Sequence, residues 1–409
     1  MNPSPIFLPD DLIAKLLSFL PVKSLVRFKC VSKSWRTLIS DSTFVKLHLK
    51  NSATQNPMFT LITHHMKTIS GDSPYGSYKE DYSVVPYPIA TLLDNPALPL
   101  FDDPYYYVKN KGCSKVIASC NGLILLTGDL FNGIYSECWF QLWNPATKTI
   151  SKEIGYFDFD KPFRYAFGCD DSTNTYKVVA SRYIPKQRTT EVRILSLDDD
   201  VWRDIESFPV VPLHLDYAEY NIYDSVYGGV YLSGTVNWLA IHNNIHYNTY
   251  VIKNITVEDF VIVSLDLRTE TYNQYRLPRD FDEVPPSDPT IGVLGGFLCF
   301  SYSYKNTDFV IWRMKKFGVE DSWTQFLKIN YQNLQTGYDI NDFTKYYFHL
   351  MPLLLSKDGD TLVLKIKNED QAILYNLRDN RVKRTKIRGG GWVCWESLKG
   401  YTESLVPVY

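Results

Sequence analysis

The feature that most constrains this chain is its first fifty residues, in which apolar residues recur at helical spacing between Leu8 and Leu49. The clearest of these patterns runs from Leu12 to Leu20, and Pro21 ends it after about two and a half helical turns. A helix of this length is marginal by itself in water. Something else should therefore cover the apolar face that it leaves over.

Three more short helices are expected in the same stretch. The second begins near Lys23, the third carries Trp35, and a short fourth carries Phe44. Asp10 and Asp11 stand just ahead of the first helix, where carboxylates cap free amides and complement the helix dipole. The sequence thus predicts a small all-α domain over residues 1–50.

Charge is distributed unevenly along the chain. Residues 1–50 carry eight Lys/Arg and three Asp/Glu, a net charge of +5, whereas the whole chain has a net charge of −2. A basic head complements an acidic partner surface and speeds encounter, although the same side chains could simply solvate the outer helix faces. Because the larger region is acidic, we expect no nucleic-acid partner.

The sequence shows neither a secretory signal nor a membrane span. The apolar helix near the N-terminus is short and contains Lys15, and no run of about eighteen or more apolar residues occurs. The seven cysteines are odd in number and widely scattered, which is typical of reduced thiols. We therefore expect a protein of the cytoplasm, the nucleus or both, without a membrane partner.

The composition changes after the helical region. None of the 30 tyrosines precedes Tyr75, and aromatic and β-branched residues then dominate. The polar segment Asn51–Pro57 ends in proline and is predicted to be a linker. From Met58 onward, short apolar runs are separated by Gly, Pro, Asn and Asp, so residues 58–409 are expected to form a large all-β domain.

Two kinds of strand unit recur in this region, at irregular spacings of roughly 45–70 residues. One is a small-residue turn followed by an apolar strand, as in residues 121–126, 234–240 and 295–300. The other is a hairpin with a polar turn, which is clearest in residues 140–150. Similar hairpins begin at Val192, Val261, Val310 and Ala372.

These repeats favour an irregular β-propeller of about six blades, because one such sheet cannot bury both of its faces alone. The first blade is expected between Met58 and Pro99. The C-terminal segment Tyr401–Val408 is expected to pair with this first blade and to close the ring. An irregular β-sandwich or barrel is the alternative.

The helical region resembles a known domain in the order of its residues. Leu-Pro at residues 8–9, a helix that ends in Leu-Pro at residues 20–21, and FKCVSKSWRTLISDSTF at residues 28–44 resemble the F-box in the form common among plant F-box proteins. The resemblance covers nearly all of residues 8–49, and it departs from the family at Lys15, where an acidic residue is frequent. It implies binding to a Skp-type adaptor, which links F-box proteins to a cullin ubiquitin ligase.

The resemblance also implies which residues bind the adaptor. The predicted adaptor-binding residues are Leu8, Pro9, Leu12, Leu16, Leu20, Pro21, Ser24, Leu25, Val31, Ser32 and Trp35. Spacing alone does not separate an interface from the core of a helical cap, so both roles stay open here. Trp35 is expected to serve both.

The β region carries motifs of a second domain. NGLILL (121–126), LWNPATKTI (142–150), AFGCDDSTNTYKVV (166–179), GGVYLSGTVNWLA (228–240) and YTESLVPV (401–408) resemble the plant F-box-associated domain, of the kelch-like type 1 form. Each motif is loose, but their order downstream of an F-box is specific. The resemblance covers roughly Gly112 to Tyr409 and implies a module that recruits a target protein.

No residue pattern points to catalysis or to a bound cofactor. A nucleophile elbow, a phosphate-binding glycine loop and a zinc-protease helix are all missing from the sequence. His242 and His246 lie in a polar, loop-like stretch that no Cys-x-x-Cys pair accompanies. We therefore expect no catalytic residue, no cofactor and no metal site.

Tyrosine-rich loops are the predicted target-binding surface, because a rigid β scaffold presents its loops and tyrosine offers apolar area together with a hydroxyl. The predicted target-binding residues are Tyr105, Tyr106, Tyr107, Tyr217, Tyr220, Tyr302 and Tyr304. Each of these rings could instead pack between blades.

Together, these features predict a non-catalytic substrate-recognition subunit of an SCF-type (Skp adaptor, cullin, F-box) ubiquitin ligase. The F-box would bind a Skp-type adaptor and, through it, a cullin, and the β domain would bind an unidentified target. Two alternatives stay open: an interaction protein that leads to no degradation and, with less support, an enzyme with its active site on the propeller axis.

Overall fold

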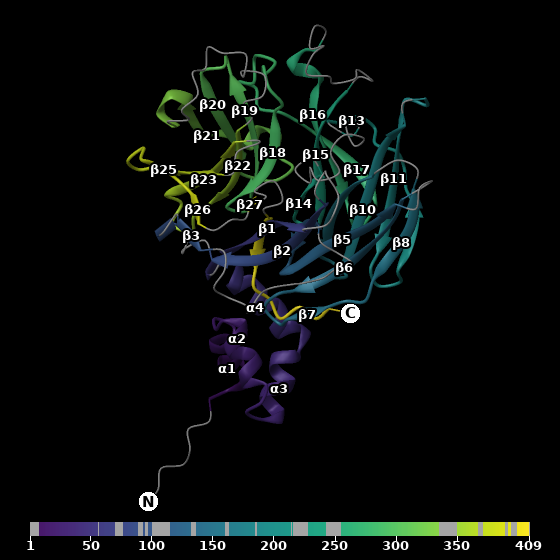
Figure 1. Cartoon of the computed structure of the whole chain (residues 1–409), viewed down its shortest axis with the longest axis vertical. Helices are drawn as coiled ribbons and strands as arrows, with labels where there is room; N and C mark the ends of the chain where they lie inside the picture. The colour runs from purple at the N-terminus through teal and green to yellow at the C-terminus, as the bar shows by residue number, and fades with distance from the viewer. Residues whose placement is uncertain are drawn as a thin grey trace, which may run out of the picture.

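The computed structural model of the chain describes residues 8–55, 57–69, 77–88, 93–94, 97–99, 115–131, 136–159, 163–184, 186–213, 215, 228–242, 255–334, 350–366, 371–388, 392–393 and 399–408. A small group of helices lies at one end of the molecule, and β-sheets form the larger part (Figure 1). This arrangement confirms the predicted all-α head followed by a large all-β domain.

The head consists of four α-helices. They are α1 (Asp10–Leu17), α2 (Val22–Phe28), α3 (Lys33–Ser40) and α4 (Ser42–Gln55). Pro9 and Pro21 directly precede α1 and α2, where the missing N–H costs no helical hydrogen bond. Ser32 caps α3, because its Oγ accepts a hydrogen bond from the Trp35 N–H at 3.1 Å.

Two details of the head differ from the sequence prediction. Asp10 and Asp11 lie inside the first turn of α1 and form no side-chain cap, so they act only through the helix dipole. Helix α4 is long rather than short and includes most of the predicted linker, Asn51–Pro57. The Asn51 side-chain amide donates to the Ser18 Oγ at 2.7 Å, so the polar residues that suggested a linker instead fasten α4 to the end of α1.

Three of the β-sheets are antiparallel meanders, in which strands pair in chain order. The strands of the first are β9 (Arg164–Asp170), β10 (Thr175–Ile184), β11 (Thr189–Ser196) and β12 (Val201–Asp204). Those of the second are β18 (Thr290–Leu294), β19 (Phe297–Tyr304), β20 (Asp308–Met314) and β21 (Trp323–Asn330). Those of the third are β22 (Leu350–Leu355), β23 (Thr361–Ile366), β24 (Ala372–Asn376) and β25 (Val382–Arg384).

Two five-stranded sheets follow the same plan with one strand added. The strands of the first are β4 (Lys115–Cys120), β5 (Leu123–Phe131), β6 (Ser136–Asn144), β7 (Thr149–Ile150) and β8 (Ile154–Phe159). Those of the second are β13 (Val211–Pro212), β14 (Val230–Leu232), β15 (Thr235–Ile241), β16 (Phe260–Asp266) and β17 (Thr271–Arg276). Short 3-10 helices are η5 (Val257–Asp259), η6 (Glu320–Ser322) and η7 (Tyr331–Leu334).

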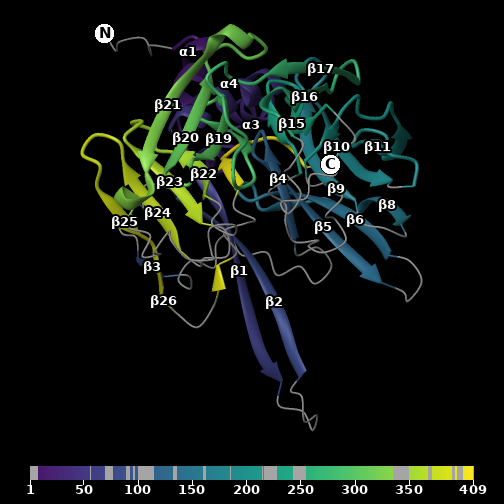
Figure 2. The same ribbon diagram turned by 90° about the horizontal axis from the view of Figure 1, so that it is seen from above.

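The remaining sheets join the two ends of the β region. Strand β1 (Pro57–Ile69) pairs with β2 (Ser77–Pro88), β27 (Trp392–Val393) and β28 (Lys399–Thr402), and the long β1–β2 hairpin projects from the domain (Figure 2). A short parallel pair joins β3 (Ala97–Pro99) to β26 (Lys386–Arg388). The pairing of Tyr401 with Met58 confirms the prediction that the C-terminal segment closes the domain against its first strands.

One strand of each large sheet contacts the corresponding strands of the sheets on either side. The contacts run from β28 to β4, β9, β14, β18 and β22 and back to β28. This closed circle is the arrangement of a β-propeller. The exact number of blades, about six from the repeats, stays a prediction.

The predicted hairpins are all present, and three of their turns share one chemistry. The Asn144 Oδ1 accepts hydrogen bonds from the backbone N–H groups of Ala146 and Thr147 at 3.0 and 3.3 Å. Asp266 and Asn376 begin the β16–β17 and β24–β25 turns in the same way. A short side chain that accepts such bonds is typical of a tight turn, so the repeated Asn/Asp positions place the hairpins.

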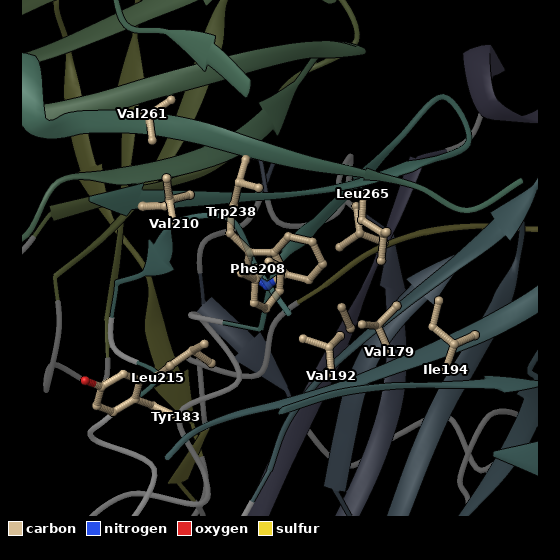
Figure 3. Packing of buried hydrophobic residues seen from close by; sticks show 14 of the residues in the cluster. Val179, Tyr183, Val192, Ile194, Phe208, Val210, Leu215, Trp238, Val261 and Leu265 are labelled. Atoms are coloured by element: carbon tan, nitrogen blue, oxygen red, sulfur yellow. The ribbon is translucent and has the colours of Figure 1, made fainter. Parts of the chain in front are cut away.

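The apolar cores lie between neighbouring sheets. In the core between the β9–β12 and β13–β17 sheets, Val179 and Val192 face Leu265 (Figure 3). Phe208 packs edge-on against Trp238, with ring centroids 4.9 Å apart and an interplanar angle of 71°. Close packing in the cores between neighbouring sheets makes the β domain a rigid scaffold.

Candidate interaction surfaces

The helical head has an apolar face that nothing in the described part of the chain covers. Leu12 and Leu16 lie one turn apart on α1 and are both exposed, and Leu8 just ahead of the helix is exposed as well. Leu16 is 61% exposed, and Val31, between α2 and α3, is 66% exposed. Exposed large aliphatic side chains that gather on one small domain are typical of a protein–protein interface.

The opposite side of the same helices forms the core of the head. Leu17, Val22 and Leu25 are buried together with Ile39 and Phe44. Phe28 and Trp35 border this core, with their rings edge to face at a centroid distance of 5.2 Å and an angle of 76°. Burial thus separates the core residues of the head from its exposed apolar residues, which spacing in the sequence left open.

The predicted adaptor-binding residues fall into three classes of exposure. The exposed ones are Leu8, Pro9, Leu12, Leu16, Pro21, Val31 and Ser32. The half-buried ones are Leu20, Ser24 and Trp35. Leu25 departs from the prediction, because its side chain is fully buried in the head core and offers no surface to a partner.

Two exposed apolar residues of the head were not predicted. Phe19 follows α1, and Val26 lies on α2; both are exposed. An apolar residue outside the apolar pattern of the helices was the sequence signal available for both. They extend the apolar character of the head surface beyond α1.

Family comparisons identify both parts of the chain. A family described as the F-box domain matches residues 7–47, and a family described as the F-box associated beta propeller domain matches residues 91–408. The chain belongs to the F-box proteins with an F-box associated β-propeller domain. Several relatives that cover more than 90% of the chain come from a plant, which agrees with the resemblance seen in the sequence.

Among these relatives, an F-box/kelch-repeat protein of Arabidopsis thaliana is 28% identical over 391 residues, covering 92% of this chain and 90% of that protein. The F-box protein CPR1 of Arabidopsis thaliana is 25% identical and covers 93% of this chain and 84% of its own length. Among solved structures, the β-propeller domain of the Trilobed protease from Pyrococcus furiosus has a TM-score of 0.37 at 11% identity, over 79% of each chain.

The second predicted surface lies on the F-box associated domain. Tyr302 is 4% exposed and packs in the core between β15 and β19, against Phe281 and Phe300, so it belongs to the domain core rather than to its outer surface. The predicted residues Tyr105, Tyr106, Tyr107, Tyr217 and Tyr220 lie outside the described residues.

Tyr304 is the predicted target-binding residue that reaches the surface in the described part of the chain. The Lys305 Nζ lies 5.0 Å from the centroid of its ring, and the Lys328 Nζ lies 4.5 Å from it. Two ammonium groups over one ring make a cationic spot on an otherwise acidic domain. The arrangement can receive a carboxylate, but it holds no group for covalent chemistry.

The buried groups of the described β domain whose pKa is raised are mainly thiols and phenols. Burial raises the pKa of the Cys138 and Cys169 thiols to about 12 and that of Cys299 to about 11. Thiols with such pKa values stay protonated and unreactive near neutral pH. Among the residues that the structure describes, no group of three or more His, Cys, Asp or Glu side chains could hold a metal ion, and His246 lies outside them. None of the described helices is long and apolar enough to span a membrane.

Proposed function

We propose that this F-box protein is a substrate-recognition subunit of an SCF-type ubiquitin ligase. Its F-box would bind a Skp-type adaptor, and through it a cullin, while the F-box associated domain binds a target protein. The protein itself catalyses nothing in this proposal. It raises the concentration of the target near a ubiquitin-charged enzyme that another subunit carries.

The observation that carries the proposal is the group of exposed apolar residues on the F-box, which are Leu8, Leu12, Leu16 and Val31. Burying an exposed aliphatic side chain contributes about 1.5–3 kcal/mol. Several such residues on one face are enough to offset part of the association cost of about 4–15 kcal/mol. The net charge of +5 on residues 1–50 adds attraction to an acidic adaptor surface.

Co-purification with a purified Skp-type adaptor tests this assignment. We expect the full chain to form a stoichiometric complex and Leu16→Asp to lose it, because the substitution places a charge in the apolar face. The matched control is Val319→Asp, which makes a comparable change at an exposed residue of the β domain. Equal adaptor binding by the two variants would contradict the assignment.

Binding of an adaptor without degradation of a target is the alternative for the same surfaces. Proteins captured by the full chain should become more abundant in cells when the proteasome is inhibited, and this increase should be absent in cells that express only Leu16→Asp. If the abundance of the captured proteins changes neither with proteasome inhibition nor with Leu16→Asp, the result would favour a non-degradative interaction protein.

We place the protein in the cytoplasm, the nucleus or both. The support is chemical: the described cysteines, which are Cys30, Cys120, Cys138, Cys169 and Cys299, are all free thiols, as is usual in reducing compartments. A fluorescent fusion that accumulated in the secretory pathway would contradict this placement.

A further inference from the structure

The C-terminal segment 402–408 lies between the F-box and the β domain. Strand β28 runs antiparallel to β1, and β1 leads away from the end of α4, so the chain after Thr402 runs back toward the head. In Figure 1 the C-terminus lies beside α4 and β7, next to the helical head. The last residues of the chain therefore meet its first helices.

Successive side chains of this segment point alternately to the two domains, as in an extended chain. On the head side, Leu405 is buried in the same core as Leu17, Val22 and Phe44. On the other side, Val406 is buried in the β-domain core between β5 and β9. One stretch of backbone thus contributes to both apolar cores.

Hydrogen bonds follow the same alternation. The carboxylate of Glu403 accepts a hydrogen bond from the Val22 N–H at the start of α2. Burial raises the pKa of this carboxyl group, and the bond from Val22 opposes that shift. The Asn144 Nδ2 of the β domain donates to the carbonyl oxygens of Ser404 and Val406 at 3.1 and 2.8 Å.

The β-domain turns fit closely around the segment. The Tyr401 hydroxyl oxygen accepts a hydrogen bond from the Ala146 N–H at 3.2 Å, and Ala146 itself borders the head core. Gly122, in the β4–β5 turn, has φ +79°, and a Cβ there would lie 2.6 Å from the Thr402 carbonyl oxygen and closer still to the Ser404 side chain. Only glycine allows this approach.

Three motifs of the β region meet at this place. Gly122 belongs to NGLILL, Asn144 and Ala146 belong to LWNPATKTI, and Leu405 belongs to YTESLVPV. Neither adaptor binding nor target binding, as proposed above, requires these residues. Their meeting at one place indicates a further role for the three motifs.

We propose that the segment Thr402–Val408 is a clamp that fixes the F-box on the β domain, so that the two parts move as one body. The clamp completes the core of the head while β28 closes the propeller. A target held by the β domain would then face the adaptor at a fixed orientation. The clamp itself is a property of the chain alone and does not depend on the proposed ligase function.

Distance measurements between two spin labels test the clamp. One label goes on Cys30, which is exposed in the head, and the other on Val201→Cys, at an exposed site of β12, with Cys113 and Cys394 replaced by serine. We expect one narrow distance distribution in this protein. Asn144→Ala removes the two bonds to the clamp, together with the two that Asn144 accepts within its own turn, and replaces no residue of the head core. It should broaden the distribution at least twofold.

Two further variants make the outcome decisive. Leu405→Asp should broaden the distribution and raise hydrogen exchange in α1–α4 more than tenfold, while Pro407→Asp, at an exposed position of the same segment, should change neither. The clamp is overturned if the distribution stays narrow in Asn144→Ala and Leu405→Asp, or if it is already broad in the parent protein. Absence of adaptor binding would contradict the proposed function but not the clamp.

Discussion

His48 of α4 and Leu20, which follows α1, are joined across the head: the Nε2 of His48 lies 3.0 Å from the carbonyl oxygen of Leu20. The imidazole is almost fully buried and stacks on Phe44, with ring centroids 6.4 Å apart. Its Nδ1 is buried without a hydrogen-bond partner in the described part of the chain. The geometry fits a neutral ring that donates from Nε2.

The F-box should therefore lose stability as the pH falls. Burial lowers the pKa of His48 below its usual value of 6.5, and the bond to Leu20 opposes this only in part. Below pH about 6.5, His48 is protonated in the unfolded chain but stays neutral in the folded chain. The free energy of unfolding therefore falls as the pH falls, until the pH reaches the lowered pKa of the folded state. Hydrogen exchange in α1–α4, corrected for intrinsic rates, should be faster at pH 5.8 than at pH about 7.5.

His48→Phe provides the control for this prediction, because it keeps the ring against Phe44 and removes the titration. Glu403, whose pKa is raised by burial, acts in the opposite sense, since its stabilising contribution is lost as the pH rises. The difference between the two proteins thus isolates His48. An unchanged pH dependence in His48→Phe would contradict the assignment.

Leu25 and Leu16 should respond differently to truncation. Leu25→Ala leaves a cavity in the head core and should lower the free energy of unfolding of the F-box by about 2–5 kcal/mol, whereas Leu16→Ala should change it by less than about 0.5 kcal/mol. Hydrogen exchange in α1–α3 measures both effects. At low temperature, where the variant stays folded, Leu25→Ala should still bind the adaptor. If a folded Leu25→Ala protein lost binding, Leu25 would have to contact the adaptor.

In the head, the positions of the helices were predictable from the sequence, but the buried side of each helix was not. Helical spacing and the Leu-Pro pairs predicted the helices, because proline and apolar periodicity act locally. Spacing did not distinguish Leu25 from Leu16, since the side on which a helix is covered depends on residues far away in the chain. Here Leu405, from the far end of the chain, contributes to the core that covers Leu25.

In the β domain, local turns were predictable from the sequence, but the burial of individual side chains was not. The hairpin turns were predictable because Asn144, Asp266 and Asn376 bond to their own turns. The burial of Tyr302 was not, because it depends on Phe281, which packs against this ring from another part of the chain, while Phe300 lies two residues away on the same strand. Composition identified the tyrosines as interface candidates but not the direction in which each ring points.

Neighbouring blades should be coupled by Lys177 of β10. Its Nζ donates to the carbonyl oxygen of Leu267 at 2.5 Å and pairs with the Glu270 carboxylate at 2.8 Å, both in the next sheet. Lys177→Met leaves the Leu267 carbonyl oxygen without this donor and leaves the Glu270 carboxylate with a longer contact to Arg203, at 3.5 Å. The substitution should lower the free energy of unfolding by about 1–3 kcal/mol. Urea unfolding measures the change, and Lys186→Met, at an exposed position, is the matched control. Equal unfolding midpoints would show that the pair is not stabilising.

Cys30 should be the fastest-reacting thiol of the described residues. It is exposed, whereas burial raises the pKa of Cys138 and Cys169 to about 12 and that of Cys299 to about 11, so these three hold almost no thiolate near neutral pH. In a Cys113→Ser, Cys394→Ser background, a maleimide should modify Cys30 at least about 100-fold faster than the buried thiols, as peptide mass spectrometry would show. Urea should abolish this difference. Because Cys30 adjoins the exposed Val31, the modified protein should also lose adaptor binding, and rapid native-state modification of Cys138 or Cys299 would contradict the burial that underlies the prediction.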